Sequence, residues 1–447
     1  MPQFLSSTLT TPFPIPHCAI LLTSILTLAL LTACNDQPES DNGEVTGYIN
    51  ATIWDGVSQA PIGNAGLVVR NGIIEELVPM ADWTLPEETE TVDLAGLYVI
   101  PGLINAHGHV GMARGLETGP EVHSEENVID QLGVYARYGI TSVVSLGDEP
   151  PQAADVRDRL NPAEEGIARL WLAGRVLNPE SPEEAVQQVD QLIEVFNPDW
   201  SKIRVDDQLG QTEKMSPPVY GATIDASHQH GVPLAAHIVT LEDAKGVLEE
   251  GADLIAHSVR DQPVDDEFID EMLNLDICIT PTLTREVSVF IYADRPDFFD
   301  DPFFLREADQ QVIGQLQDPD VQAQYTGEAA DFYREALPLA LENMMTLHQA
   351  GVRIAMGTDS GPPGRFQGYF EHIEMEMMQE AGMTPGEVLL SATQHAANCS
   401  GIDDRVGTLE AGKQADFVVV RANPFDDVEN LRELEAVYIG GVAVGMD

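Results

Sequence analysis

The sequence predicts an α/β fold in which a parallel barrel of strands and helices lies between two β-rich chain ends. Residues 98–402 alternate short apolar, strand-like runs with amphipathic helical stretches, a pattern typical of parallel strands joined by helices. Residues 47–97 and 403–447 carry short strand-like runs separated by turns. We therefore expect a barrel domain at 98–402 and one small β-sandwich formed from both termini.

Turn signals support the β-rich ends. Residues 67–70 and 73–78 flank Asn71 and Gly72, and this dipeptide supplies the positive φ angles of a type I′ hairpin turn. The other end repeats the style, with strand-like runs at 416–420, 437–439 and 442–444. Both ends therefore offer strands to a shared domain.

One complete crossover unit can be recognised in the middle of the chain. Thr240 and Asp243 begin a helix that closes at Gly251. This helix lies between an apolar run that ends at His237 and a second run that ends at His257. A strand, a helix and a strand in this order predict a parallel unit, and repeated units predict a barrel.

A set of six residues suited to a metal site lies in or directly after these short apolar runs. His107 and His109 are two positions apart, so both side chains point to the same side of a strand and can bind one cation. A single histidine at the end of a strand could equally be a buried polar residue of the core that binds no metal. The set as a whole favours one or two divalent metals, most plausibly zinc: His107, His109, Lys202, His237, His257 and Asp359.

The order and context of these six residues resemble the amidohydrolase superfamily, metal-dependent hydrolases built on a distorted TIM (β/α)8 barrel. The resemblance covers nearly the whole chain after the first forty-odd residues. Many members also have a small β-sandwich domain. The branch with a bridging lysine contains imidazolonepropionase-like proteins and dipeptidases that act on Xaa-Pro or related peptides.

The resemblance implies a binuclear centre. His107 and His109 would bind the more buried metal, and His237 and His257 would bind the second one. Lys202, converted by CO2 to a carbamate, would bridge the two ions. We expect Zn2+, with Mn2+ or Co2+ as alternatives.

Lys202 also has a simpler interpretation. It could extend toward solvent, or pair with Asp206 or Asp207. Its apolar neighbours Ile203 and Val205 argue for burial, where an uncompensated ammonium group is costly. The carbamate itself rests on the resemblance alone.

Asp359 would be both a metal ligand and the catalytic base in such a centre. A hydroxide shared by two metals would attack a C–N bond in a small amide, a cyclic amide or a dipeptide-like molecule, and Asp359 would pass its proton to the leaving amine. Lactonase or phosphoesterase activity on the same centre is the alternative. A non-catalytic lipoprotein that binds a metal or a solute is a further one.

Substrate-binding residues are expected among cations on the loops that follow the strands. Arg260 and Arg285 are the preferred carboxylate-binding candidates, and Arg365 and Tyr369 follow the segment that holds Asp359. The alternative for each arginine is a pair with a neighbouring acid that holds a loop.

The charge balance is strongly acidic. The chain has 22 Lys and Arg residues against 74 Asp and Glu residues, a formal net charge of −52. Most of the surface should therefore repel nucleic acid and anionic membranes. The resemblance implies a small-molecule amide or peptide substrate as the partner, and we expect membrane contact only through a lipid anchor. The composition favours a solvated acidic coat suited to high external salt over a specific cationic partner. Whether the chain forms a homo-oligomer stays open.

The first 33 residues read as a signal peptide of the lipoprotein type, followed by an acidic tether at 34–46. Residues 18–33 are apolar, and Leu31-Thr32-Ala33-Cys34 resembles a bacterial lipobox in which Cys34 is lipidated. No Lys or Arg precedes the apolar run. Cleaved export and an uncleaved anchor are the alternatives. We expect an exported protein that is anchored by lipid in the bacterial cell envelope.

Two cysteines remain in the mature body. Cys278 and Cys399 have apolar or small neighbours, where a free buried thiol is the usual state. We therefore expect no disulfide bond between them.

Overall fold

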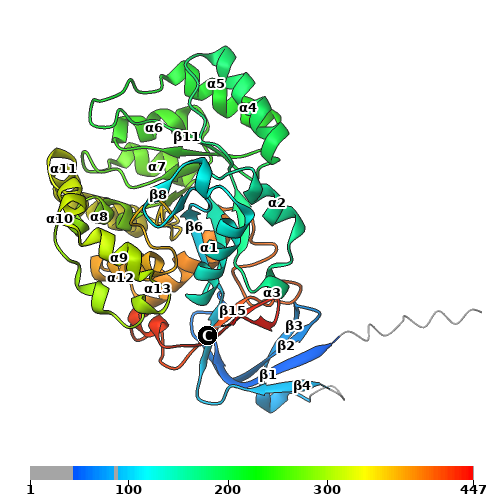
Figure 1. The fold of residues 1–447 in the computed structure, drawn as a ribbon. Helices are drawn as coiled ribbons and strands as arrows, with labels where there is room; N and C mark the ends of the chain where they lie inside the picture. Colours follow the sequence, from blue (N-terminus) through cyan, green and yellow to red (C-terminus); the bar gives the residue numbers. More distant parts are fainter. Residues whose placement is uncertain (1–43, 85–88, 446–447) are drawn as a thin grey trace, which may run out of the picture. The chain divides into compact units, whose positions relative to one another are not determined.

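The computed structural model describes residues 44–84 and 89–445 (Figure 1). The predicted signal peptide, the lipidation site at Cys34 and most of the predicted tether lie outside these residues. None of the helices in the described ranges is both long enough and apolar enough to cross a bilayer.

Seven short parallel strands form the centre of the larger domain, as two hydrogen-bonded groups. The strands of a barrel are buried on both sides, which explains their continuous apolar runs. One group has the order β10-β9-β6 and the other the order β11-β12-β13-β14. Their bounds are β6 (Leu103–Gly108), β9 (Ile140–Ser145), β10 (Arg169–Leu172), β11 (Ser201–Arg204), β12 (Leu234–His237), β13 (Leu254–Ala256) and β14 (Cys278–Thr280).

Single parallel bridges link the two groups. Leu177 pairs with Ile203 on one side. On the other side Ile354 pairs with Ile279, and Ser360 pairs with Gly108. Residues 354–360 therefore lie between β14 and β6, where an eighth strand belongs. The fold is the predicted distorted barrel, with isolated bridges in place of regular ladders at these points.

Helices pack around these strands (Figure 1). The predicted crossover is confirmed: the Thr240 side chain accepts a hydrogen bond from the Asp243 backbone N–H at the start of α6, and β12 and β13 are parallel. The helices are α1 (Glu125–Arg137), α2 (Gln152–Arg159), α3 (Pro162–Glu165), α4 (Pro182–Phe196), α5 (Pro217–Gln229), α6 (Leu241–Glu249), α7 (Asp266–Leu275), α8 (Leu283–Ser288), α9 (Gln310–Leu316), α10 (Pro319–Gln322), α11 (Glu328–Ala350), α12 (Tyr369–Ala381), α13 (Pro385–Leu390) and α14 (Ala396–Cys399).

The two chain ends meet in one eight-stranded sheet of order β17-β16-β15-β5-β1-β2-β3, with β4 paired to β1. The predicted hairpin is present, with φ 50° at Asn71 and 80° at Gly72. At Asn50, where φ is 66°, β1 changes its parallel partner from β4 to β5. The strands are β1 (Val45–Ile53), β2 (Ile62–Arg70), β3 (Ile73–Pro79), β4 (Glu90–Asp93), β5 (Tyr98–Pro101), β15 (Phe417–Val420), β16 (Leu434–Ile439) and β17 (Val442–Ala443).

This small domain has its own core. Tyr48 of β1 packs edge-on against Phe417 of β15, with ring centroids 4.8 Å apart. Leu67 of β2 lies in the same buried cluster. Because β5 starts at Tyr98, the sheet extends slightly beyond the predicted limit at residue 97. A short hairpin of β7 (Ala113–Arg114) and β8 (Glu117–Thr118) follows β6.

The expectation of two free thiols is wrong. Cys278 and Cys399 form a disulfide bond, with their Cα atoms 5.8 Å apart. The two residues are 121 positions apart in the sequence, and only the fold brings the end of α14 against β14. Both side chains are buried, so the apolar surroundings were predicted correctly but the bond was not.

Candidate metal centre and active site

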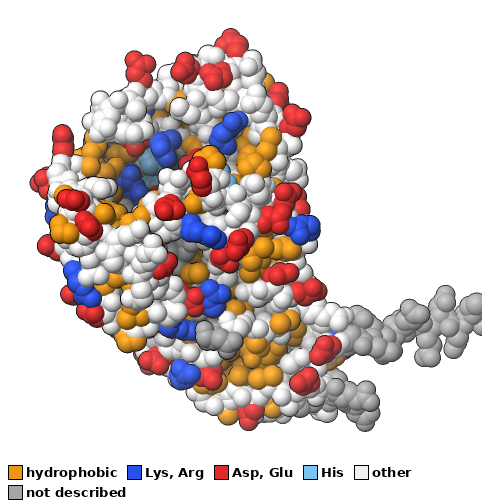
Figure 2. Space-filling model, viewed as in Figure 1, with side chains coloured by type: hydrophobic (Ala, Val, Ile, Leu, Met, Phe, Trp, Pro, Cys, Tyr) orange, Lys and Arg blue, Asp and Glu red, His pale blue; other side chains and the backbone are white. Residues whose placement is uncertain are grey.

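All six predicted ligand residues line a single pocket of about 410 Å³. Three of them lie in strands: β6 holds His107, β11 holds Lys202 and β12 ends at His237. His257 directly follows β13. His109 directly follows β6. Asp359 lies in residues 354–360, the segment between β14 and β6. Figure 2 shows a hollow in which Lys, Arg and His side chains gather on a face that is elsewhere rich in acidic residues.

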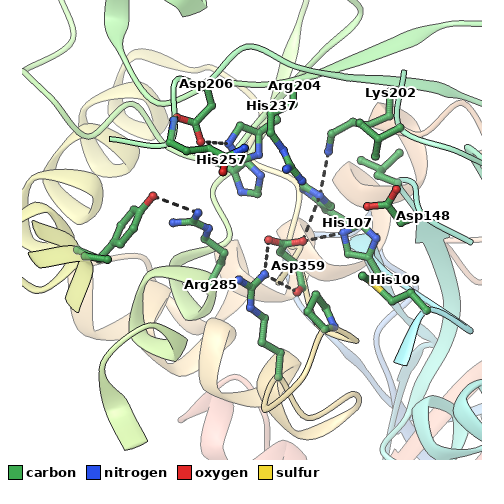
Figure 3. Close-up of a pocket in the computed structure, with 18 of the residues that line it drawn as sticks. His107, His109, Asp148, Lys202, Arg204, Asp206, His237, His257, Arg285 and Asp359 are labelled. Atoms are coloured by element: carbon green, nitrogen blue, oxygen red, sulfur yellow. Dashed lines mark hydrogen bonds and ion pairs between the residues drawn. The ribbon is translucent and has the colours of Figure 1, made fainter. Parts of the chain in front are cut away.

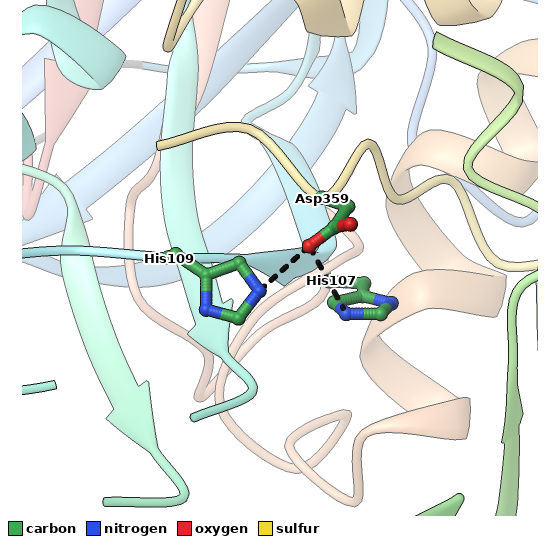
Figure 4. Close-up of side chains that lie close together, drawn as sticks. All are labelled: His107, His109 and Asp359. Atoms are coloured by element: carbon green, nitrogen blue, oxygen red, sulfur yellow. Dashed lines mark hydrogen bonds and ion pairs between the residues drawn. The ribbon is translucent and has the colours of Figure 1, made fainter. Parts of the chain in front are cut away.

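Three of these residues already form a compact donor cluster (Figure 4). One donor atom from each of His107, His109 and Asp359 lies within 4.8 Å of the others. Oδ1 of Asp359 is 2.7 Å from Nε2 of His109 and 3.8 Å from Nε2 of His107. Two imidazoles and one carboxylate with this spacing can share one divalent cation.

Hydrogen bonds on the far side of the imidazole rings aim Nε2 at the pocket. Nδ1 of His109 lies 2.6 Å from the Gly147 carbonyl oxygen. A carbonyl can only accept, so Nδ1 donates and Nε2 faces Asp359. Burial alone would lower the pKa of His109, but the hydrogen bond with Asp359 raises it, so a cation bound here would replace the proton on Nε2. Nδ1 of His257 lies 2.6 Å from Thr282 Oγ1, which orients that ring in the same way.

The remaining two histidines lie beside this cluster. The ring of His257 is 4.8 Å from that of His107 and 4.2 Å from that of His237, measured between centroids. Burial lowers the pKa of His237 to about 3, and it holds the pKa values of His107 and His257 well below their usual range. The rings are therefore neutral, which is the form that binds metals.

Nε2 of His237 is a buried polar atom without a hydrogen-bond partner among the described residues. It lies 3.3 Å from Asp206 Oδ2, an ion-pair distance, but the two groups are not aligned for a hydrogen bond. A buried imidazole nitrogen without a hydrogen-bond partner, close to the rings of His257 and His107, fits a cation site. His107, His109 and Asp359 therefore suit a divalent metal, and the nitrogens of His237 and His257 lie beside this group.

Lys202 is only 3% exposed, which contradicts the interpretation that it extends into solvent. Its Nζ atom lies 3.1 Å from His107 Nε2. In the described part of the chain it forms no ion pair with Asp206, Asp207 or any other carboxylate. Burial lowers the pKa of the Lys202 amine to about 7. The amine is thus available in its neutral, nucleophilic form near neutral pH.

Several residues around the pocket have left-handed backbone conformations. The φ angles are 63° at Asp148, 78° at His257, 51° at Thr282 and 56° at Asp359. A non-glycine residue in this region is strained, and such residues concentrate at functional sites.

The predicted substrate-binding residues divide into two groups. Arg285 and Arg365 line the pocket, together with Arg204. Arg260 does not line it: the side chain is 2% exposed, donates to the Ile238 and Ser258 carbonyls, and lies 3.2 Å from Glu286. Tyr369 donates to Asp301 and lines a different cavity. We therefore do not propose Arg260 or Tyr369 as substrate contacts.

Arg285 is held by residues that the sequence did not single out. Its guanidinium lies 3.1 Å from Glu286, donates to the Tyr333 hydroxyl at 3.2 Å and stacks 4.3 Å from the centre of the Tyr333 ring. Tyr333 belongs to α11 and lies 48 positions after Arg285 in the sequence. Only its position in the fold marks it as part of the pocket wall.

Comparison with known proteins agrees with this geometry. The profile of the Amidohydrolase family matches residues 98–444. The chain belongs to the amidohydrolase family. This amidohydrolase is 24% identical over 425 residues to the imidazolonepropionase of Chromobacterium violaceum, which covers 83% of the chain and 90% of the relative. It is a metal-dependent hydrolase of carbon–nitrogen bonds.

Solved structures confirm the fold of the amidohydrolase. A Xaa-Pro dipeptidase with methionine bound in its active site superimposes with a TM-score of 0.73 at 22% identity, over 90% of this chain and 99% of the other. Phenylurea hydrolase B gives a TM-score of 0.71 at 21% identity, over 90% and 97% of the two chains. The TIM-type barrel with a β-sandwich domain is therefore shared with these enzymes.

Proposed function

We propose that this amidohydrolase hydrolyses an amide bond in a small dipeptide-like molecule or cyclic amide with a binuclear metal centre, most plausibly zinc. The main support for this proposal is that all six candidate ligands line one pocket. His107 and His109 would hold one ion and His237 and His257 the other. The low pKa and the burial of Lys202 support its conversion to a bridging carbamate.

Two bound divalent ions would supply Lewis acidity, which makes water a nucleophile near neutral pH. The protein supplies the proton transfer. Burial alone would raise the pKa of Asp359, but Arg365 and His109 hold it well below its usual range. Its carboxylate is therefore ionised and can take a proton from the attacking water and deliver it to the leaving nitrogen.

The pocket wall supports an anionic substrate. Three arginines line this pocket in a chain that has only 22 Lys and Arg residues: Arg204, Arg285 and Arg365. The guanidinium of Arg204 forms no hydrogen bond or ion pair with any residue in the described ranges, so its charge is available to a ligand. A carboxylate would meet Arg204 and Arg285, because guanidinium groups bind carboxylates strongly.

The same three arginines favour one alternative reaction. A phosphoester would also be attracted by this wall, since arginine binds phosphate as well as carboxylate. The relatives named above act on C–N bonds by their names, which supports amide hydrolysis as the first proposal.

We also propose that the protein is exported and anchored by a lipid on Cys34. The proposal comes from the sequence of residues 1–34. The Cys278–Cys399 disulfide supports it, because such bonds persist in oxidising compartments outside the cytosol.

A substrate panel tests the proposed reaction. Metal-loaded protein would be assayed with dipeptides, their C-terminal amides, N-acyl amino acids, hydantoin-like rings, lactones and phosphoesters. We expect turnover of C–N substrates that stops with a chelator and returns with zinc. Weaker turnover of C-terminal amides would support the carboxylate site. Turnover confined to phosphoesters or lactones, or insensitive to the chelator, would contradict the proposal.

A further inference from the structure

A second cavity of about 550 Å³ adjoins the active-site pocket. Met112 and Asp148 line both spaces, so the two spaces meet at these side chains. Pro150, Pro151, Val195 and Phe196 give the second cavity most of its apolar surface. Its lining also includes charged residues: Asp148, Glu149, Arg175 and Glu194. A substrate that is cleaved in the first space can thus extend an apolar group into the second.

The carboxylate of Asp148, where the two spaces meet, is unpaired among the described residues. Its carboxylate accepts no hydrogen bond and forms no ion pair with any residue of 44–84 or 89–445. A solvated aspartate on a plain surface would need no explanation. Asp148, however, follows β9 at the catalytic rim, with φ 63°, and its negative charge acts on the buried amine of Lys202. It therefore lies close to the reacting centre.

In Figure 3, Asp148 and Arg285 lie on opposite sides of Asp359. Asp206 also lines the pocket, but it lies 3.3 Å from His237, whereas the Asp148 carboxylate has no such contact among the described residues. An unpaired anion on one side of Asp359 and a guanidinium on the other complement a substrate that carries a positive group at one end and a negative group at the other. An α-amino group directly beside the scissile carbonyl and a carboxylate beyond the scissile nitrogen have this arrangement.

We propose that Asp148 binds the free ammonium group of a zwitterionic, dipeptide-like substrate, and that the adjoining cavity accepts the apolar side chain next to that group. The substrate carboxylate then faces Arg204 and Arg285. This inference rests on the proposed C–N hydrolysis and narrows it to molecules with a free amino end and a bulky apolar side chain at that end.

The ammonium site is tested with matched substrates. Asp148→Asn keeps the shape of the side chain and removes its charge. We expect kcat/KM for dipeptides with a free amino group to fall by roughly ten- to a hundredfold, while the values for their N-acetylated forms change little. Asp130→Asn, which alters an exposed carboxylate on α1 paired with Arg114, is the control. Metal content is measured in each variant.

The apolar cavity is tested separately. Val195 is 53% exposed on α4, so Val195→Glu should fold normally and place a charge on the cavity wall. We expect kcat/KM to fall several-fold for dipeptides with an N-terminal Leu or Phe and to stay constant for an N-terminal Gly. Val186→Glu, at an exposed position of the same helix outside the cavity, should have neither effect.

The outcomes distinguish this inference from the reaction itself. If wild-type enzyme cleaves N-acetylated and free dipeptides equally, or if Asp148→Asn slows both equally, the ammonium site is wrong while C–N hydrolysis stands. If Asp148→Asn loses metal, Asp148 acts on the metal centre instead of on the substrate. Equal losses for Gly and Leu substrates in Val195→Glu would remove the cavity from the proposal. No C–N turnover in metal-loaded wild type would overturn the underlying function.

Discussion

Nη1 of Arg365 lies 2.5 Å from Oδ2 of Asp359, and Nε of the same guanidinium donates to Ser288 Oγ at 3.0 Å. The arginine is thus fixed on the carboxylate that is expected to act as base. A positive charge at this distance favours the ionised form of an acid. The contact therefore keeps the Asp359 carboxylate ionised over a wide pH range.

Arg365→Met should move the acidic limb of the activity profile. Arg365 lowers the pKa of Asp359, so its removal raises that pKa and protonates the base at higher pH. We expect the acidic limb of kcat/KM to shift to higher pH, with losses of several-fold or more at pH 5 and smaller losses at pH 8. Arg334→Met, which breaks an exposed pair with Asp331, is the control. An unmoved limb would mean that Arg365 only holds its loop.

Asp359→Asn should remove the base and retain the shape. An amide cannot accept the proton, so we expect kcat to drop by at least about a hundredfold while substrate binding survives. Steady-state kinetics with metal analysis on the same sample would check this. Asp276→Asn, at an exposed site paired with Arg353, should be near normal. Near-normal turnover in Asp359→Asn would exclude the proposed mechanism.

Lys202→Ala should lower the metal content. We expect about two equivalents per chain in wild type and one or fewer in the variant. Because the pKa of the amine is about 7, the neutral form rises from roughly a tenth at pH 6 to roughly nine tenths at pH 8. Reconstitution of metal-free enzyme with zinc and dissolved CO2 should accordingly be faster at pH 8. One tightly bound metal in wild type, with full activity in the variant, would refute the binuclear centre.

The disulfide should contribute measurably to stability. It closes a loop of 121 residues, and a cross-link of this length stabilises a fold by about 2–5 kcal/mol. The variant with both Cys278→Ser and Cys399→Ser should melt at a lower temperature than wild type. A reductant should lower the melting temperature of wild type toward that of the variant and leave the variant unchanged. Equal melting temperatures with and without reductant would show that the bond carries no stability.

The lipid anchor can be tested by cell fractionation. Wild-type protein should sediment with membranes, and Cys34→Ser should release it or block its processing. Cys399→Ser, which alters a cysteine of the folded body, should leave the membrane association unchanged. Soluble wild-type protein that begins at an unmodified Cys34 would contradict the anchor.

Most ligand candidates could be predicted from a local rule. The four histidines and Asp359 end or directly follow short apolar runs, and the ends of parallel strands converge at one rim of a barrel. Lys202 is the second residue of β11, and its assignment as a ligand came from the family resemblance. The hairpin at Asn71 was predictable from a local rule as well, since two residues determine its turn type.

The contacts of the two arginine side chains could not be predicted from the sequence, because they depend on how the chain packs. Arg260 and Arg285 both follow strands and look equivalent in the sequence. The fully buried Glu286 lies between them, and Arg260 points inward while Arg285 lines the pocket. The disulfide and the contact with Tyr333 depend in the same way on segments that meet only in the folded chain.

The shared sheet of the two chain ends imposes an order on biosynthesis. β5 pairs with β15, so the residues near 100 cannot form this pairing until the residues near 418 have been synthesised. The ribosome must release almost the whole polypeptide before this sheet can complete its central ladder. Until then one edge of β5 is unpaired, whereas β1 and β2 can already pair within the N-terminal segment. A chain that ends before residue 417 would keep all six candidate metal ligands but would leave that edge of β5 without its partner.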